Sequence, residues 1–430
     1  MDLETKQNVF NNLKPTQPMN WSLSKKILFR LLFSYLFLYT MSIQFVLSDW
    51  LDSLWESLTL WFGNQVLVLS EPLVYNETGS GDSTYDYILN LLMVIIAVVV
   101  ATIWSLLDRK RESYQKLLDY LVILVRYYLA YQMIQYGFAK VFCLQFPEPS
   151  LHRLQQPLGE YSPMGLAWAF VGYSKGFEIL TGSLELLGGT LLLFRRIQTL
   201  GALVTFVVMS NVVALNFFYD IPVKLLSSQL TLMCLFLMLM DRRRLINVFF
   251  KNRTAEPLEI RPVFTKKKWR IAKNVVKWQV IPVFIGYTIY IMFGYRAEMA
   301  AWFKGCPTCG DYTVTSFVHG NLVEEQKKEC DQWQSIQVWD EQNLSVETYC
   351  DDNIDFEYIV YPDSNQLILN YPERSRKFIF DYSFEAEKGI RFDGRWRKQN
   401  LRVICDELKA EDFPLMQGEF RWINEFPDNR

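Results

Sequence analysis

Histidine is nearly absent from this sequence: its 430 residues include two, His152 and His319, and neither lies in a long apolar run. A haem held by two intramembrane histidines is therefore excluded, as is a histidine-rich zinc or iron site inside a membrane. The sequence also lacks a glycine-rich phosphate loop, a dinucleotide-binding fingerprint and the serine turn of α/β-hydrolases. We therefore expect no metal site and no haem.

Basic residues are missing from one long loop and concentrated in another. Loop 48–86 has no Lys or Arg and seven acidic residues, whereas loop 242–277 has twelve basic residues. Lysine and arginine accumulate on the cytoplasmic side of membrane proteins, so this contrast predicts an integral membrane protein in contact with a lipid bilayer. A basic loop next to a membrane favours contact with anionic lipid, and no nucleic-acid partner is expected.

Seven apolar runs are long enough to cross a bilayer, which takes roughly 20 residues. We expect spans at 27–47, 87–107, 118–143, 165–194, 197–217, 223–241 and 276–295. The cytoplasmic segments that follow from this order hold 22 Lys and Arg, and the outer loops 48–86, 144–164 and 218–222 hold only Arg153. The N-terminus is therefore expected in the cytoplasm and the C-terminus outside it.

The outer loop after the first span is rich in tryptophan and leucine between Trp50 and Leu73. A helix lying in the membrane interface places such side chains at headgroup level. We expect an interfacial anchor here, and a lid or lateral gate is the alternative.

The composition changes at Arg296, where charged residues become frequent. The last 135 residues contain 16 basic and 26 acidic side chains. Apolar residues alternate with polar ones in the segments 356–361, 366–371, 377–382 and 390–396, with turn residues at 362–365 and 387–389. This pattern predicts an acidic outer domain folded as a small antiparallel β barrel or sandwich. These strands carry no catalytic constellation, so a docking or folding module is favoured.

The seven cysteines are unevenly placed. Cys234 falls inside a predicted span and Cys143 at the outer end of another, while the outer domain holds Cys306, Cys309, Cys330, Cys350 and Cys405. An oxidising outer compartment would allow disulfides among these five. Five is an odd number, so either one thiol is free or Cys143 supplies the sixth.

The motif Cys306-Pro-Thr-Cys309 has three interpretations. It is a structural disulfide, a redox pair in which one thiolate attacks and the second resolves the mixed disulfide, or half of a metal knuckle. The metal interpretation is the weakest, because Cys330 and Cys350 do not form a second pair with this spacing. In the redox interpretation Cys306 and Cys309 are the catalytic residues.

Ionisable residues inside predicted spans are costly and therefore mark candidate sites. Glu178 and Glu185 are seven residues apart and share one helix face, as do Arg126 and Lys140 on the preceding span. Depths calculated from a rise of about 1.5 Å per residue pair Arg126 with Glu185 and Lys140 with Glu178.

Two interpretations of these charges stay open. They form buried ion pairs that fix the helix register, or they line a polar pocket for a quinone headgroup, a proton or a small solute. In the second case Asn211 and Asn216 would line the same pocket, and Asp220 with Lys224 would close it on the outer side.

The stretch from about Lys116 to Phe250 resembles the DoxX-like family of four-helix bacterial membrane proteins. The residues that carry the resemblance are Arg126-Tyr-Tyr-Leu-Ala, Tyr136-Gly-Phe-Ala-Lys140, Gly176-Phe-Glu178-Ile, Gly182-Ser-Leu-Glu185, Leu187-Gly-Gly189, Arg195-Arg196 and the helix bearing Asn211. Segments 216–224 and 420–430 look like a longer, Bacteroidetes-type branch. The resemblance implies membrane redox chemistry, such as quinone reduction coupled to sulfur-compound oxidation, with Arg126, Lys140, Glu178 and Glu185 as the matching charged residues.

The expected architecture is an all-α membrane bundle of about seven helices in a bacterial inner membrane, followed by a periplasmic antiparallel β domain. Its parts are a cytoplasmic tail 1–26, two spans with an interfacial loop 27–115, a four-helix DoxX-like core 116–250, a basic loop 251–275, a last span 276–295 and the β domain 296–430.

Three functions stay open. The first is a subunit of a quinone- or thiol-linked redox system, with quinone as its cofactor. The second is a non-enzymatic envelope assembly protein that presents its acidic domain to a protein partner. The third is a transporter.

Overall fold

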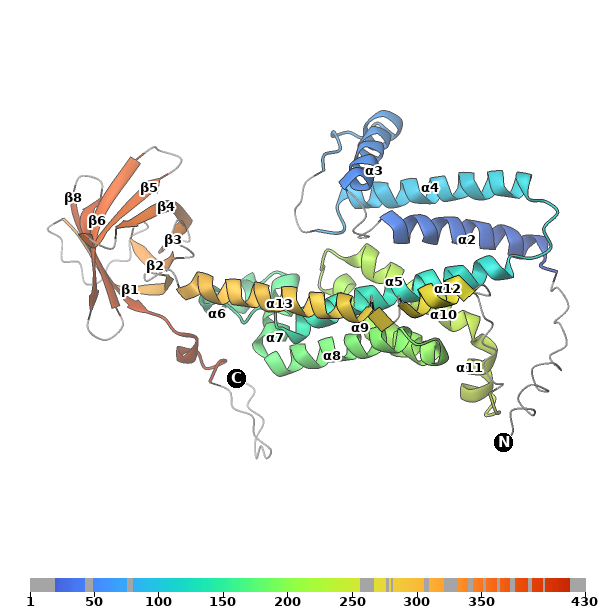
Figure 1. Cartoon of the computed structure of the whole chain (residues 1–430). Helices are drawn as coiled ribbons and strands as arrows, with labels where there is room; N and C mark the ends of the chain where they lie inside the picture. Colours follow the sequence, from blue (N-terminus) through green and yellow to red (C-terminus); the bar gives the residue numbers. More distant parts are fainter. Residues whose placement is uncertain are drawn as a thin grey trace. The chain divides into compact units, whose positions relative to one another are not determined.

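The computed structural model describes residues 20–42, 49–75, 80–255, 267–275, 278–279, 281–304, 309–320, 332–338, 343–350, 353–361, 364–371, 376–385, 389–396 and 399–417 (Figure 1). The chain forms two compact units, 1–141 with 179–288 and 142–178 with 289–430. The first is helical, and the second contains a β barrel. Helices followed by an antiparallel β domain are what the sequence predicts.

The helices of the first unit are α2 (Leu23–Ser42), α3 (Asp49–Trp61), η1 (Phe62–Leu67), α4 (Thr84–Leu107), α5 (Gln115–Val141), most of α8 (Lys175–Leu192), η3 (Arg195–Ile197), α9 (Gln198–Phe218), α10 (Lys224–Met240), α11 (Arg242–Phe249), α12 (Lys267–Val275) and the start of α13 (Ile281–Lys304). The second unit contains α6 (Leu151–Gln155), η2 (Leu158–Glu160), α7 (Pro163–Tyr173), the rest of α13, the eight strands and η7 (Ala410–Asp412).

Within the described part of the chain, three helical segments are long and apolar enough to cross a membrane. They are α4, α5 and the segment Arg195–Phe218, and a fourth would be α10 with α11, which meet at a bend of 80°. The helix α2 falls short because it carries Lys25, Lys26 and Arg30. The structure thus supports a membrane protein and three to four of the seven expected spans.

The predicted span 165–194 is not one helix. It is divided into α7 and α8, which meet at Ser174 in an extended conformation (φ −111°, ψ 96°). The Ser174 hydroxyl accepts a hydrogen bond from the Phe177 amide at 3.3 Å. Serine often caps the start of a helix in this way, because its hydroxyl accepts from an amide that has no partner within the helix. The expectation of a single continuous helix over 165–194 is therefore wrong.

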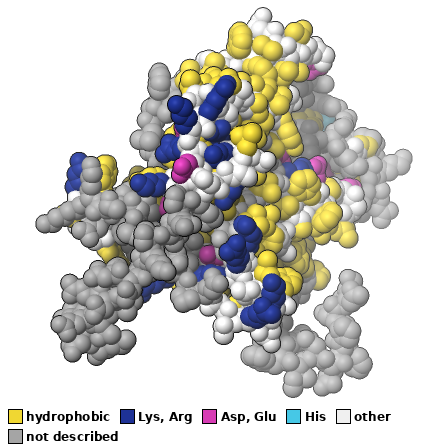
Figure 2. Space-filling view, turned by 90° about the vertical axis from the view of Figure 1, so that its right-hand side faces the viewer, with side chains coloured by type: hydrophobic (Ala, Val, Ile, Leu, Met, Phe, Trp, Pro, Cys, Tyr) yellow, Lys and Arg dark blue, Asp and Glu magenta, His cyan; other side chains and the backbone are white. Residues whose placement is uncertain are grey.

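The first unit combines an apolar core with an apolar surface. Phe29, Leu36 and Tyr39 of α2 pack with Met93 of α4 and Leu129 of α5. The opposite side of α4 is exposed and almost entirely aliphatic, through Leu91, Val94, Ile95, Val98, Val99, Val100, Ile103 and Leu106. The face seen in Figure 2 likewise shows many apolar side chains among clusters of Lys and Arg. An aliphatic surface along a 24-residue helix is typical of contact with lipid.

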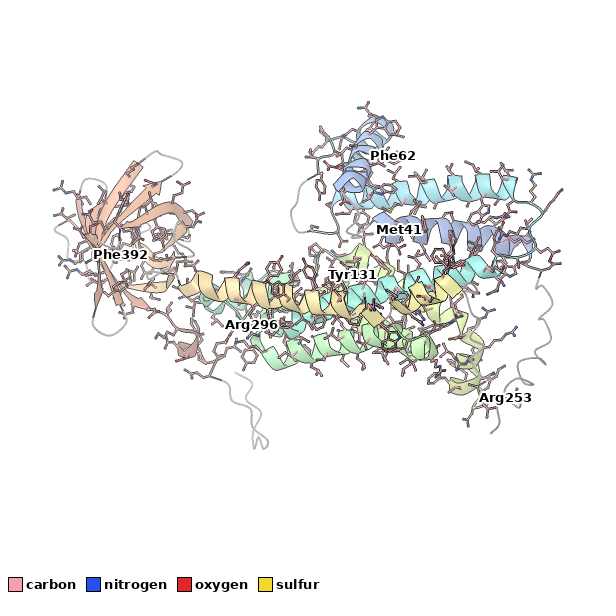
Figure 3. All side chains as sticks on the ribbon, in the orientation of Figure 1. Met41, Phe62, Tyr131, Arg253, Arg296 and Phe392 are labelled. Carbon is pink, nitrogen blue, oxygen red and sulfur yellow. The ribbon has the colours of Figure 1, made fainter. Side chains whose placement is uncertain are left out.

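The predicted interfacial segment is helical and packs on α4. Phe62, at the start of η1, is buried with Leu73, Tyr85, Ile88 and Leu92 (Figure 3). On the other side of α3 the exposed apolar residues are Leu54, Leu58 and Trp61, with helical spacing. Interfacial anchoring by this face stays a prediction.

A buried arginine ties α2 to the connection between α4 and α5. Arg30 is 2% exposed, and its guanidinium donates to the Tyr114 hydroxyl at 2.6 and 3.0 Å, to Ser105 Oγ at 2.8 Å and to the Asp108 carbonyl at 2.7 Å. Tyr114 in turn donates to the Asp108 carboxylate at 3.0 Å. These hydrogen bonds stabilise the buried charge of Arg30, a residue that was not among the predicted site residues.

The C-terminal β domain is a closed barrel, which decides between the two predicted architectures. Strands β1 (Gly310–His319), β2 (Trp333–Val338), β3 (Asn343–Thr348), β4 (Asn353–Tyr361), β5 (Gln366–Tyr371), β6 (Arg376–Glu385), β7 (Gly389–Trp396) and β8 (Gln399–Glu407) are antiparallel in sequence order. The ring closes where β8 pairs with β1, with Val314 opposite Cys405. A closed ring leaves no unpaired strand edge.

Aromatic side chains fill much of the barrel interior. Trp333 is 2% exposed, and its ring centroid lies 5.5 Å from that of Trp396 and 6.1 Å from that of Phe380. Along β8 the residues Leu401, Val403 and Cys405 point inward in alternation. An eight-stranded barrel is just wide enough for side chains to fill it.

Candidate functional site

A buried ion pair joins α5 to α8. Lys140 Nζ lies 2.6 Å from Glu185 Oε1, and the two side chains are 10% and 3% exposed. Lys140 is in the last turn of α5, and Glu185 is in the middle of α8. The attraction between two opposite charges at hydrogen-bond distance offsets part of the free-energy cost of removing them from water.

Glycines allow the two helices to approach at this point. A Cβ atom on Gly137 would lie 2.9 Å from the Gly182 carbonyl oxygen, and one on Gly182 would lie 2.7 Å from the Gly137 carbonyl oxygen. Neither position has room for a larger side chain. The same crossing puts Lys140 against α8, since a Cβ atom added to Gly182 would lie 2.7 Å from the Cβ atom of Lys140. Small residues at such crossings are typical of membrane helices.

The pair has unused hydrogen-bonding capacity. Glu185 Oε2 is buried, and no described residue donates to it. The Tyr136 ring lies on the other side, with its centroid 5.9 Å from Lys140 Nζ. A lysine ammonium has three N–H groups, and Glu185 Oε1 accepts one of them. The site therefore offers both a donor and an acceptor to a polar group that enters it.

The partners predicted from helix depth are wrong. Arg126 does not pair with Glu185, and Lys140 does not pair with Glu178; the structure pairs Lys140 with Glu185. The depth calculation treated 165–194 as one straight helix that starts at the outer surface. In the structure α8 begins only at Lys175 and crosses α5 at Gly137. This crossing brings Glu185 to Lys140, and Glu185 lies seven residues, or about two helical turns, beyond the predicted partner Glu178.

Glu178 is fully buried, and Phe146 and Cys143 of its own unit are among its partners. Its Oε1 accepts the amide hydrogen of Phe146 at 3.0 Å, and the Cys143 thiol is within hydrogen-bonding reach of the carboxylate. The neighbouring Lys175 is exposed and pairs with Glu148 at 2.7 Å. The expectation that Glu178 and Glu185 occupy the buried face of one helix agrees with their burial.

The remaining predicted polar residues have separate environments. Arg126 is 5% exposed and donates to Gln198 Oε1 at 3.5 Å. Asn211 is exposed on α9, so the structure does not place it in a buried pocket. Asn216 is buried and donates to Ser227 Oγ at 2.9 Å. The hypothesis of one pocket lined by all these residues is therefore not supported by their burial.

A carboxylate that the sequence analysis missed organises the start of α10. Asp82 accepts the amide hydrogens of Lys224 at 2.6 Å and Leu225 at 2.9 Å, although it lies about 140 positions earlier in the chain. Lys224 Nζ also pairs with Asp220 at 2.7 Å. Asp82 stands next to Ser83, which caps α4, so no local pattern distinguishes its role from that of an ordinary turn residue.

Replacing Asp82 with alanine should destabilise the helical unit by about 1–2 kcal/mol, because two amides at the start of α10 lose their acceptor. Chemical unfolding of the purified protein in detergent measures this change. The matched control is Asp220→Asn, which removes the charge of an 81% exposed side chain, tolerates the positive φ of 51° at this position and should cost under about 1 kcal/mol. Equal effects of the two substitutions would contradict the capping role of Asp82.

Tyrosines and amides form a second polar set that the sequence analysis did not use. Tyr35 donates to Asn90 Oδ1 at 2.9 Å, and Gln132 donates to the Tyr128 hydroxyl at 3.0 Å. The rings of Tyr39 and Tyr128 are 6.2 Å apart. The signal was present in the four-residue spacing of Tyr35 with Tyr39 on one helix and of Tyr128 with Gln132 on another.

The cysteines fall into two groups. Cys143, Cys234 and Cys405 are free thiols, and burial raises the pKa of the Cys405 thiol to about 12. Cys309 and Cys350 are each engaged in a disulfide, and their pairing stays a prediction. Cys306 and Cys330 lie outside the described residues, so the pairing and the redox role of the Cys306-Pro-Thr-Cys309 motif stay predictions. Among the residues that the structure describes, no group of three potential metal ligands occurs.

Comparison with known proteins gives one informative match. No family model matches the chain, and no solved structure is similar to it. The Bacillus subtilis protein YwoB is 36% identical over 141 residues, which are 33% of this chain and 87% of YwoB. The chain belongs to the YwoB family. YwoB is described as an uncharacterized protein, so this membership assigns no activity, and two thirds of the chain lie outside the match.

Proposed function

We propose that this YwoB relative is a seven-span protein of a bacterial inner membrane, with a cytoplasmic N-terminus and a periplasmic barrel. The distribution of Lys and Arg supports this orientation. We also propose that residues 116–250 form a DoxX-like core. In support, α5, α8, α9 and α10 occupy the segments in which the resemblance expects four helices.

Within this core, we propose that Lys140 and Glu185 bind the headgroup of a quinone-like ligand for a quinone- or thiol-linked redox system. The observation that carries this proposal is the buried Glu185 Oε2, which has no donor among the described residues, beside a lysine with unused N–H groups. A quinone carbonyl accepts from Lys140, and a quinol hydroxyl donates to Glu185. The pair thus matches both redox forms of the headgroup.

The proposed electron donor is the Cys306–Cys309 pair on the outer side. Oxidation of two thiols to a disulfide releases two electrons and two protons, which together convert one quinone to one quinol. Unchanged thiol turnover after Cys306→Ser would contradict this role.

Quinone retention tests the headgroup site. The full-length protein is purified from membranes in mild detergent, and its bound quinone is extracted and quantified. Glu185→Gln should lower retention at least tenfold, because a charged acceptor is lost at the headgroup. The control is Glu148→Gln, which neutralises a 44% exposed carboxylate in the same fold and should leave retention unchanged. Retention by Glu185→Gln at the level of the unaltered protein would reject the site.

The alternative is an envelope assembly protein that uses its barrel for docking. It is favoured by an apolar row on the outer face of β4, β5 and β6, where Ile359, Ile368 and Ile379 lie opposite one another. Ile359 and Ile379 are 46% and 57% exposed. In that case Ile359→Lys with Ile379→Lys would abolish co-purification of a protein partner, and Glu185→Gln would leave it intact.

A further inference from the structure

The guanidinium group of Arg126 is buried without an anionic partner among the described residues. Its side chain is 5% exposed, and its Nε–H is buried with no acceptor. Its contacts are a long hydrogen bond to Gln198 Oε1 at 3.5 Å and Tyr127, whose ring lies 4.9 Å from the guanidinium carbon and whose hydroxyl is within hydrogen-bonding reach. Neither contact neutralises the charge, and an uncompensated buried charge is expensive.

The surroundings of Arg126 are positive as well. Arg195 is close enough for its charge to act on Arg126. Gln198 is the first residue of the 21-residue helix α9, and the residue before it, Ile197, provides no side-chain cap. The positive end of the helix dipole lies at this turn and favours an anion nearby.

A carboxylate beside the first turn of α9 is already engaged. Asp241 accepts a hydrogen bond from the Thr199 hydroxyl and lies 3.8 Å from Arg244. No ion pair within 4.0 Å joins it to Arg126. Asp241 therefore does not neutralise the charge of Arg126.

The connection between α8 and α9 indicates the depth of this site. The 3₁₀ turn η3 carries Arg195 and Arg196, and two arginines at the end of an apolar helix are typical of a membrane boundary. Arg126 lies beside the residue that follows this turn, although it is the twelfth residue of α5. A 27-residue helix is about 40 Å long and exceeds the hydrocarbon thickness of about 30 Å by about 10 Å, so Arg126, about 17 Å from the start of α5, lies within about 7 Å of the boundary, which its long side chain can reach.

From this geometry we infer that Arg126, Gln198 and the start of α9 form a binding site for a phosphate group. A planar guanidinium can donate two parallel N–H groups to two oxygens of a phosphate. The Nε–H of Arg126, which has no acceptor among the described residues, would be one of these two donors. The phosphate belongs to an anionic lipid headgroup at the membrane boundary or to free phosphate from solution. The site does not depend on the quinone proposal, since it shares no residue with the Lys140–Glu185 pair.

The test titrates the delipidated full-length protein with inorganic phosphate and, separately, with short-chain phosphatidylglycerol, and counts bound ligand by native mass spectrometry. Arg126→Gln should weaken binding at least tenfold. Arg196→Gln removes an exposed charge from the same turn and should leave binding within twofold of the unaltered protein. Binding of the lipid but not of inorganic phosphate supports a headgroup as the source, and equal binding of both supports free phosphate.

A second measurement covers the case in which Arg126→Gln does not fold. The unaltered protein is heated with and without each probe, and the bound probe should raise its melting temperature. Absence of any shift and of any bound probe overturns the proposal. Undiminished binding by Arg126→Gln overturns it as well.

Discussion

Lys140→Met is expected to destabilise the helical unit by about 3–5 kcal/mol, because it leaves the buried carboxylate of Glu185 without its cation. Glu185→Leu should cost a similar amount by stranding the lysine. The double variant should recover most of the loss, since two apolar side chains of similar volume need no partners. Unfolding of the four proteins in detergent gives the coupling energy directly.

The control for this cycle is the ion pair between Lys175 and Glu148, whose side chains are 64% and 44% exposed. Lys175→Met should change stability by less than about 1 kcal/mol. Additive losses in the Lys140 and Glu185 double variant would show that the two side chains do not interact. The buried pair would then have no role in joining α5 to α8.

Trp333→Ala is expected to destabilise the barrel by about 3–5 kcal/mol. The ring is 2% exposed and lies between the rings of Trp396 and Phe380, so its removal leaves a cavity in the middle of the interior. Near-ultraviolet circular dichroism during thermal unfolding follows the packing of these aromatic side chains.

The matched control is Ile379→Ala on the outer face of β6, where the side chain is 57% exposed and the expected change is under about 1 kcal/mol. If Trp333→Ala and Ile379→Ala unfold at the same temperature, the interior is not packed around Trp333.

The β domain was predictable because its signal is local. A strict alternation of apolar and polar residues over 366–371 allows few structures other than a strand with one buried face, and β5 has these bounds. Strands such as β8 were missed, although Leu401, Val403 and Cys405 alternate in the same way. Barrel closure depends on the pairing of β1 with β8, about 90 residues apart, which no local pattern encodes.

The candidate site was predictable in composition but not in pairing. Lysine and glutamate inside apolar helices mark Lys140 and Glu185 as unusual, whatever their partners. Their contact depends on where α8 begins and where Gly137 meets Gly182, and both are properties of tertiary packing. For the same reason Asp82 went unnoticed, since its partners at the start of α10 are distant in sequence.

The most direct test of the proposed redox role brings the two candidate sites together in one reaction. The purified full-length protein is fully reduced, freed of reductant and mixed with a water-soluble quinone, while quinone absorbance and the state of Cys306 and Cys309 are followed by spectroscopy and mass spectrometry. The account predicts one quinone reduced for each Cys306–Cys309 disulfide formed, and loss of this reaction in Glu185→Gln but not in Glu148→Gln. A quinone that stays oxidised beside a reduced pair, or a reaction rate unaffected by Glu185→Gln, would contradict it.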